Sequence, residues 1–129
     1  MKFGLGLAAA AALTVIASPA IAAQVRPFHA GILAQAQAQG RPILIDVYAD
    51  WCSVCKVQHK HLSELTRNPA YKNLIVLRLN YDTQKAERRK LKVPLQSTLI
   101  AFNGRNERGR LVASTDREVI SRLVRSTLK

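Results

Sequence analysis

A pair of cysteines separated by two residues, directly after an apolar run, constrains the fold of this chain more than any other feature. Residues 43–49 are mostly apolar and β-branched and end at the turn that leads to Cys52, so they predict a buried strand. After the turn, apolar residues recur at helical spacing, which predicts a helix from Cys52 to about Thr66. Both Cys52 and Cys55 are therefore expected in the first turn of a helix that follows a strand.

This junction determines the chemistry expected of the two thiols. The first backbone N–H groups of a helix lack intrahelical partners and carry partial positive charge, so they stabilise a thiolate. We therefore assign Cys52, which is nearer the helix start and expected to be the more exposed, as the attacking thiolate. Cys55 is assigned as the thiol that resolves the mixed disulfide. The Cys52–Cys55 disulfide is then the redox-active group, and we expect no further cofactor and no metal.

Asp46 places a carboxylate in the middle of the predicted buried strand. A buried carboxylate costs several kcal/mol unless it is paired or protonated. Alternation along the strand places Asp46 beneath the cysteine turn, where it could accept and return a proton during disulfide exchange. A structural carboxylate satisfied by its neighbours is the alternative interpretation.

The segment 46–56, Asp-Val-Tyr-Ala-Asp-Trp-Cys-Ser-Val-Cys-Lys, resembles the active-site segment of thioredoxin-fold proteins. It is especially similar to the C-terminal periplasmic domain of the DsbD-type thiol-disulfide interchange proteins. The similarity continues through residues 74–77, 99–102 and 103–104. This resemblance implies an α/β, thioredoxin-like fold with a central mixed β-sheet flanked by helices on both faces. It also implies that Trp51 and Lys56 belong to the active-site environment.

The loop before the predicted strand 97–102 departs from the family pattern. Thioredoxin-like proteins carry a cis-proline here, facing the cysteine pair, and alignment on Thr98 places Ser97 at that position. A cis bond before a residue other than proline costs about 3 kcal/mol, so we expect a trans or altered loop. Ser97 and Thr98 are still expected to face the thiols, with the loop backbone pairing with a substrate strand. An alignment on Pro94 is the alternative and requires a shifted loop.

The first 22 residues have the pattern of a secretory signal peptide. Lys2 provides a short charged start, residues 5–16 form an apolar core too short to span a bilayer comfortably, and residues 20–22 provide an Ala-x-Ala cleavage site. We therefore predict a signal peptide at 1–22, a thioredoxin-like domain at 23–129, and a location in the periplasm of a Gram-negative bacterium. An uncleaved N-terminal anchor is the alternative.

The remaining segments predict elements in the order α, β, α, β, α, β, β, α. A first helix is expected from Pro27 to Gln39, and Asp82 is expected to cap a short helix that ends at Lys90. Thr115 begins a capping box, Thr-Asp-Arg-Glu, before the last helix. Strands are predicted at 74–80, at 97–102 and around 111–112.

The net charge of the chain indicates which classes of partner it can bind. The formal net charge is +12, and the positive residues cluster after residue 84. Nucleic-acid binding is not favoured, because the protein is predicted to be exported and no aromatic residues interleave with the basic ones. We expect protein disulfide substrates, a monomer, and a membrane thiol-disulfide electron donor that docks on the basic segment 85–92.

Together these features predict a periplasmic thiol-disulfide oxidoreductase that acts as a reductase or electron carrier. Ser53 and Val54, between the cysteines, provide no histidine or positive charge that would overstabilise the thiolate. The resemblance to the DsbD-type proteins points in the same reducing direction.

His59 leaves an alternative open. It follows Cys55 by four residues and faces the same way on the predicted helix, where the DsbD-like family would place an acidic residue nearby. It is a surface histidine, a tuner of thiol acidity, or a metal ligand. The third possibility corresponds to a copper carrier that binds the metal through Cys52, Cys55 and His59. Asp46 and Trp51 favour the redox function, since a metal carrier needs neither.

Overall fold

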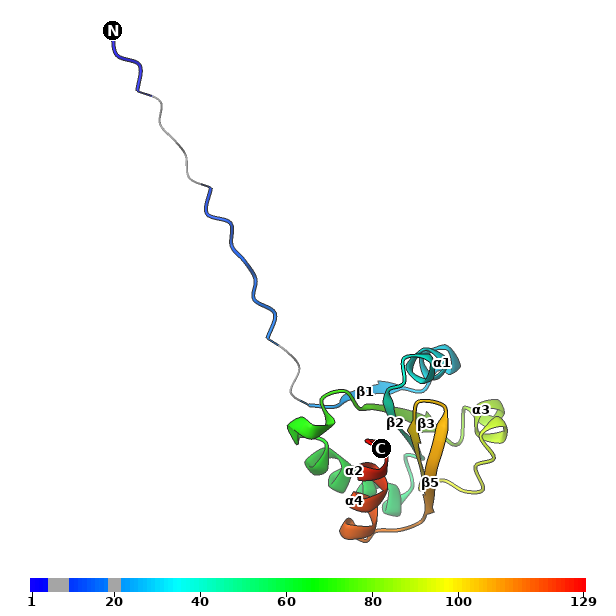
Figure 1. Ribbon diagram of the computed structural model, residues 1–129. Helices are drawn as coiled ribbons and strands as arrows, with labels where there is room; N and C mark the ends of the chain where they lie inside the picture. The colour runs from blue at the N-terminus through cyan, green and yellow to red at the C-terminus, as the bar shows by residue number, and fades with distance from the viewer. Residues whose placement is uncertain (5–9, 19–21) are drawn as a thin grey trace.

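The computed structural model describes residues 1–4, 10–18 and 22–129. Residues 10–18 form no helix or strand and lead away from the folded part of the chain (Figure 1). The elements are β1 (Gln24–Pro27), α1 (Ala30–Ala38), β2 (Pro42–Tyr48), α2 (Ser53–Leu65), the 3-10 helix η1 (Pro69–Tyr71), β3 (Ile75–Asn80), α3 (Lys85–Lys90), β4 (Thr98–Asn103), β5 (Asn106–Val112) and α4 (Arg117–Ser126).

The predicted signal peptide falls partly outside the described residues. Positions 5–9 of its apolar core and positions 20 and 21 of its cleavage site are not among them. Within the described parts of the chain, no helix is both long and apolar enough to cross a membrane. The division of the chain at residue 22 stays a prediction.

Five strands form one mixed sheet in the order β1-β3-β2-β4-β5. β1 and β2 both run parallel to β3, whereas β4 is antiparallel to β2 and β5 is antiparallel to β4. The central position of β2 follows from its sequence, because an apolar run without alternation is typical of a strand covered on both faces. The predicted mixed α/β sheet is therefore confirmed.

Helices cover both faces of this sheet, and side chains of β2 alternate between them. Ile43 and Ile45 pack in a cluster with α1 residues, whereas Leu44 packs in a second cluster with residues of α2 and α4. Asp46 has the same parity as Leu44, so it lies on the α2 side of the sheet. The alternation thus directs the only carboxylate of β2 toward the helix that carries the cysteines.

The start of the chain's first helix was predicted wrongly. Pro27 ends β1, and α1 begins at Ala30 with His29 as its N-cap, where His29 Nδ1 accepts a hydrogen bond from the Gly31 amide at 3.1 Å. Proline is tolerated in β1 because this strand forms an edge of the sheet. The strand escaped prediction because all four of its residues are exposed, so they carry no hydrophobic pattern.

Two predicted helix caps also differ from the structure. The N-cap of α3 is Gln84, and Asp82 instead accepts a hydrogen bond from the Trp51 indole. At α4 the N-cap is Asp116, whose Oδ1 accepts hydrogen bonds from the amides of Glu118 and Val119, so the predicted capping box that begins at Thr115 is wrong. Asp and Thr are both good N-caps, and local sequence alone does not choose between adjacent ones.

Two glycine turns meet at the end of the sheet away from the cysteines. Gly40 and Gly104 both have left-handed φ angles, +65° and +56°. The Gly104 amide donates to the Arg41 carbonyl at 2.8 Å, and a Cβ at Gly104 would lie 3.2 Å from the Gly40 Cα. A Cβ at Gly40 would meet nothing within 4 Å. Glycine is therefore required at Gly104 for conformation and for space, but at Gly40 for conformation alone.

This difference predicts unequal costs for two alanine substitutions. Gly40→Ala should lower the free energy of unfolding by about 1 kcal/mol through left-handed strain. Gly104→Ala should lower it by roughly 2–3 kcal/mol, because the added methyl group also presses on backbone. Urea denaturation of the two variants measures the difference, and the entropy effect of alanine on the unfolded chain is common to both. Equal losses would show that the two turns do not pack as described.

Candidate active site

The two cysteines lie at the junction between β2 and α2. Cys52 is the N-cap of α2, its Sγ accepts a hydrogen bond from the Cys55 amide at 3.1 Å, and the two residues form a disulfide. The predicted position at the start of a helix is thus confirmed. The expectation that Cys52 is the more exposed is wrong for this oxidised state, because both residues are 3% exposed. Ala49, Tyr48 and Val54 pack against the two cysteines.

The roles of the cysteines therefore rest on their hydrogen bonds and not on exposure. A sulfur at the N-cap receives an N–H donor and faces the positive end of the helix, and both favour its thiolate form. In this helix that sulfur belongs to Cys52. Cys55 Sγ instead lies 3.9 Å from the carbonyl oxygen of Val47, a weak acceptor contact that favours a protonated thiol.

The Ser97 loop lies directly against this site. The Ser97 amide donates to the same Val47 carbonyl at 2.8 Å, and no cis peptide bond occurs in the described part of the chain. Ser97 takes a left-handed φ of +62°, so the loop is trans and altered, as expected. This conformation is uncommon for a residue with a side chain, and such outliers cluster at functional sites.

The backbone of Ser97 is already committed to contacts inside the protein. Its carbonyl accepts hydrogen bonds from Gln58 Nε2 at 3.1 Å and from the Ala113 amide at 3.0 Å. Ser97 and Thr98 are both buried, whereas Leu95, the residue two before Ser97, is 38% exposed. Contact of this loop with a substrate stays a prediction, and its exposed part is the segment before Ser97.

Asp46 is buried and only half paired. It is 1% exposed, and its Oδ2 accepts a hydrogen bond from Arg78 Nε at 3.2 Å across the β2–β3 register. Oδ1 has no protein partner. Burial raises the pKa of Asp46 above its usual value, while the positive charges of Arg78 and His59 lower it in part. A raised pKa makes this carboxylate a stronger proton acceptor than an exposed aspartate, which is the property that a proton acceptor for exchange needs.

Arg78 was missed by the sequence reasoning. It is the one charged residue of β3, and its guanidinium also stacks on the Tyr48 ring with 3.9 Å to the centroid. A cation in a strand that neighbours a buried carboxylate is a sequence feature that could have predicted this ion pair. Its register opposite Asp46, however, depends on the parallel pairing of β2 with β3, which local sequence does not specify.

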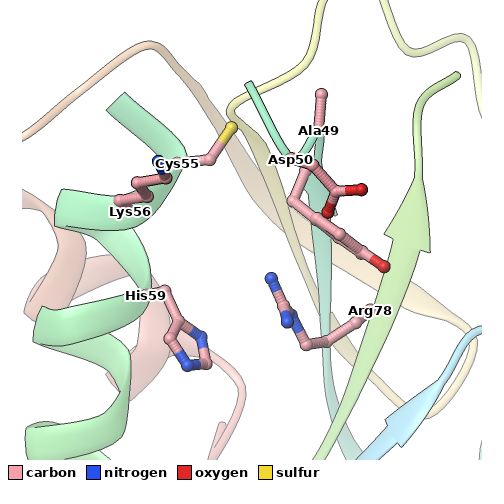
Figure 2. Close-up of a pocket in the computed structure, with 7 residues that line it drawn as sticks. Ala49, Asp50, Cys55, Lys56, His59 and Arg78 are labelled. Atoms are coloured by element: carbon pink, nitrogen blue, oxygen red, sulfur yellow. The ribbon is translucent and has the colours of Figure 1, made fainter. Parts of the chain in front are cut away.

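A pocket of about 210 Å³ opens beside the cysteine pair (Figure 2). It is lined by Tyr48, Ala49, Asp50, Cys55, Lys56, His59 and Arg78. His59 and Arg78 point into it from opposite sides, His59 from α2 and Arg78 from β3 (Figure 2). The structure thus brings Cys55, Lys56 and His59 into one pocket, next to a cation that reaches the buried Asp46.

Trp51 is held beside the cysteines by a contact that was not predicted. Its indole is 63% exposed, and Nε1 donates to Asp82 Oδ2 at 2.8 Å. This bond ties the active-site turn to the loop between β3 and α3. An exposed indole fixed at one edge provides a flat apolar surface next to Cys52.

Fold and site together define the class of this protein. A sequence model of the thioredoxin family, described as "Thioredoxin", matches residues 23–126. The chain belongs to the thioredoxin family, and its Cys52 and Cys55 form a disulfide.

Similar proteins agree with this assignment. The crystal structure of Trxlp from Edwardsiella tarda EIB202 is 42% identical, with a TM-score of 0.76 over 78% of this chain and 98% of that chain. The thiol:disulfide interchange protein DsbE of Escherichia coli K12 is 38% identical over 37% of this chain and 25% of its own length. DsbD of Pseudomonas sp. JR1 / K1 is 38% identical over 53% of this chain and 13% of its own length. The chain thus spans a quarter or less of these two interchange proteins.

The copper-carrier alternative gains no support from the structure. Within residues 1–4, 10–18 and 22–129, no three or more His, Cys, Asp or Glu side chains are grouped so as to hold a metal ion. His59 faces Arg78 across the pocket, which is an unfavourable setting for a cation (Figure 2).

The raised pKa of Asp46 predicts how stability changes with pH. The folded protein holds the Asp46 proton at pH values where the unfolded chain has released it, so this contribution is complete below about pH 3.8 and is lost as pH rises. Asp46→Asn removes the cost of burying the charge. We expect the variant to gain roughly 1–3 kcal/mol over the natural protein at pH 8 and much less at pH 4.

Urea denaturation between pH 4 and pH 8 measures this difference. Asp50→Asn is the matched control, because it removes one carboxylate at an exposed position in the neighbouring pocket at Cys55. A gain for Asp46→Asn that is independent of pH would contradict the assigned burial cost.

Proposed function

We propose that this protein is a periplasmic thiol-disulfide reductase or electron carrier. The observation that supports it most is the hydrogen bond from the Cys55 amide to Cys52 Sγ at the start of α2. This bond makes the two sulfurs chemically different and so suggests a different role for each. A thiolate on Cys52 is stabilised as nucleophile and as leaving group, whereas Cys55 lacks an equivalent donor among its contacts.

The catalytic cycle follows from these roles. The Cys52 thiolate attacks one sulfur of a substrate disulfide, and the substrate's other sulfur leaves as a thiolate that takes up a proton. Cys55 then loses its proton and attacks Cys52 Sγ, so that the Cys52–Cys55 bond forms and the second substrate thiolate is released. Two electrons pass from the protein to the substrate. Asp46 is the buried group that manages the proton of Cys55.

The direction of electron flow is inferred from what surrounds the cysteines. Ser53 and Val54 provide no cationic group between them, so the reduced pair is not specially stabilised from within the motif. The thiol:disulfide interchange proteins that match the chain perform exchange of this type by name. Both points support a donor of electrons to protein disulfides.

The basic segment around α3 supports a membrane donor as the partner. Lys85, Arg88, Arg89 and Lys90 lie on α3, and Arg110 of β5 donates to the Lys92 carbonyl at 3.2 Å. α3 begins three residues after Asp82, which holds the Trp51 indole beside Cys52. An acidic surface on the donor would be steered to this basic segment and would meet the disulfide nearby.

A trapping experiment tests the proposed function. Cys55→Ser removes the resolving thiol, so it should accumulate mixed disulfides through Cys52 when the full chain is expressed in a Gram-negative host. Periplasmic and membrane fractions, acid-quenched and run without reductant, should contain these complexes. In the same cells the natural protein should be mainly in the dithiol form, as expected of an electron donor.

Two controls make the result decisive. Cys52→Ser, which keeps only the thiol that lacks the N-cap amide donor, should trap several-fold less, and Ser53→Ala should behave like the natural protein. Equal trapping by both cysteine variants would refute the roles assigned here. Complexes confined to the cytoplasm, or a natural protein held almost wholly as disulfide, would refute the location or the reducing direction.

A further inference from the structure

Two cavities meet at His59 and Arg78. The outer one, of about 210 Å³, reaches Cys55. The inner one, of about 20 Å³, lies between α2 and the sheet and reaches Asp46. Cys55 lines only the outer cavity and Asp46 only the inner one, whereas His59 and Arg78 line both. His59 and Arg78 therefore lie at the junction between Asp46 and the pocket at Cys55.

The inner cavity has the size for one water molecule. A space of this volume suffices for a water when polar groups face it. Asp46, whose buried Oδ1 has no protein partner, lines this cavity, and so do Ser63 and His59 from α2. A water at this point would satisfy the orphaned carboxylate oxygen and connect it to the imidazole.

Only one of the two shared side chains can move a proton. The Arg78 guanidinium stays protonated at any pH at which the protein is folded, so it orders Asp46 without exchanging with it. His59 is exposed to solvent, and an imidazole both takes up and releases protons near neutral pH. Resting on the proposed function, we propose that His59 relays protons between solvent, the Cys55 pocket and Asp46.

With this relay, every proton and electron pair of the resolving step is accounted for. Cys55 loses its proton through the outer pocket to the His59 imidazole, and the resulting thiolate attacks Cys52 Sγ. The Cys52–substrate bond breaks and its electron pair leaves on the substrate sulfur. His59 then passes its proton through the inner water to the Asp46 carboxylate or releases it to solvent. His59 touches no substrate atom in this scheme and acts on the substrate through Cys55.

Charges of both signs face His59. Asp46 and Tyr48 lie on β2, Asp50 on the turn that follows, Lys56 on α2 and Arg78 on β3. Carboxylates and cations therefore both face the imidazole, from β2, the turn after it, α2 and β3.

The test compares His59→Gln with the natural protein in metal-free buffer between pH 5 and pH 9. A mixed disulfide of Cys52 with a small peptide is prepared, and the rate of peptide release by Cys55 is followed by rapid acid quench. We expect the variant to be slowed about tenfold at pH 7, to lose the part of the pH profile due to the imidazole, and to be partly rescued by added imidazole. His61→Gln, two residues along α2, should be unaffected.

A double-variant cycle separates the relay from a merely structural role. If His59 acts with Asp46, His59→Gln should change the release rate little in the Asp46→Asn background. If the two residues act independently, the double variant should be slowed by the product of the two single effects. An unchanged rate and pH profile for His59→Gln would overturn the relay while leaving exchange by the cysteine pair intact. Failure of the natural protein to release the peptide at all would instead overturn the proposed function.

Discussion

The hydrogen bond from the Cys55 amide to Cys52 Sγ is the interaction on which the rest of the site depends. It exists because β2 stops at Tyr48 and α2 begins at Ser53, which leaves Cys52 to cap the helix. A helix offers unsatisfied N–H donors only at this end, so the same two cysteines one turn further along would be equivalent buried thiols. The fold thereby gives the two sulfurs of a symmetrical motif different surroundings, which is the basis of the roles proposed for them.

The sheet contributes the second half of the site by burying a carboxylate where it is unfavourable. Asp46 takes a place in β2 that an aliphatic side chain would fill at lower cost, and one bond from Arg78 satisfies only one of its oxygens. Tyr48 holds the arginine from the other side through its ring. Burial of the Asp46 charge lowers stability, and such a cost is common at functional sites.

Much of the fold around the cysteines could be predicted from the sequence, because the patterns that specify it are local. The strand 43–49, the helix after Cys52 and the buried Asp46 follow from a run of apolar residues, helical spacing and one misplaced charge. The features that the sequence did not predict depend on contacts between residues that are distant in sequence. The exposed β1 has no pattern of its own and exists only because β3 provides an edge, Arg78 meets Asp46 only through parallel register, and Asp82 binds Trp51 instead of capping a helix. The left-handed Ser97 likewise follows from hydrogen bonds to β2, α2 and the residue after β5.

The central claim is that the Cys52–Cys55 pair carries electrons to other disulfides. The most direct measurement is the reduction potential of the mature protein, equilibrated in dithiothreitol or glutathione buffers and followed through the fluorescence of Trp51, the single tryptophan of the chain. Related pairs range from roughly −270 mV for a reductant to roughly −120 mV for a strong oxidant. We predict a value in the more negative half of this range. A value near the oxidant end would contradict the reducing role, and failure to form the disulfide at all would contradict the redox function itself.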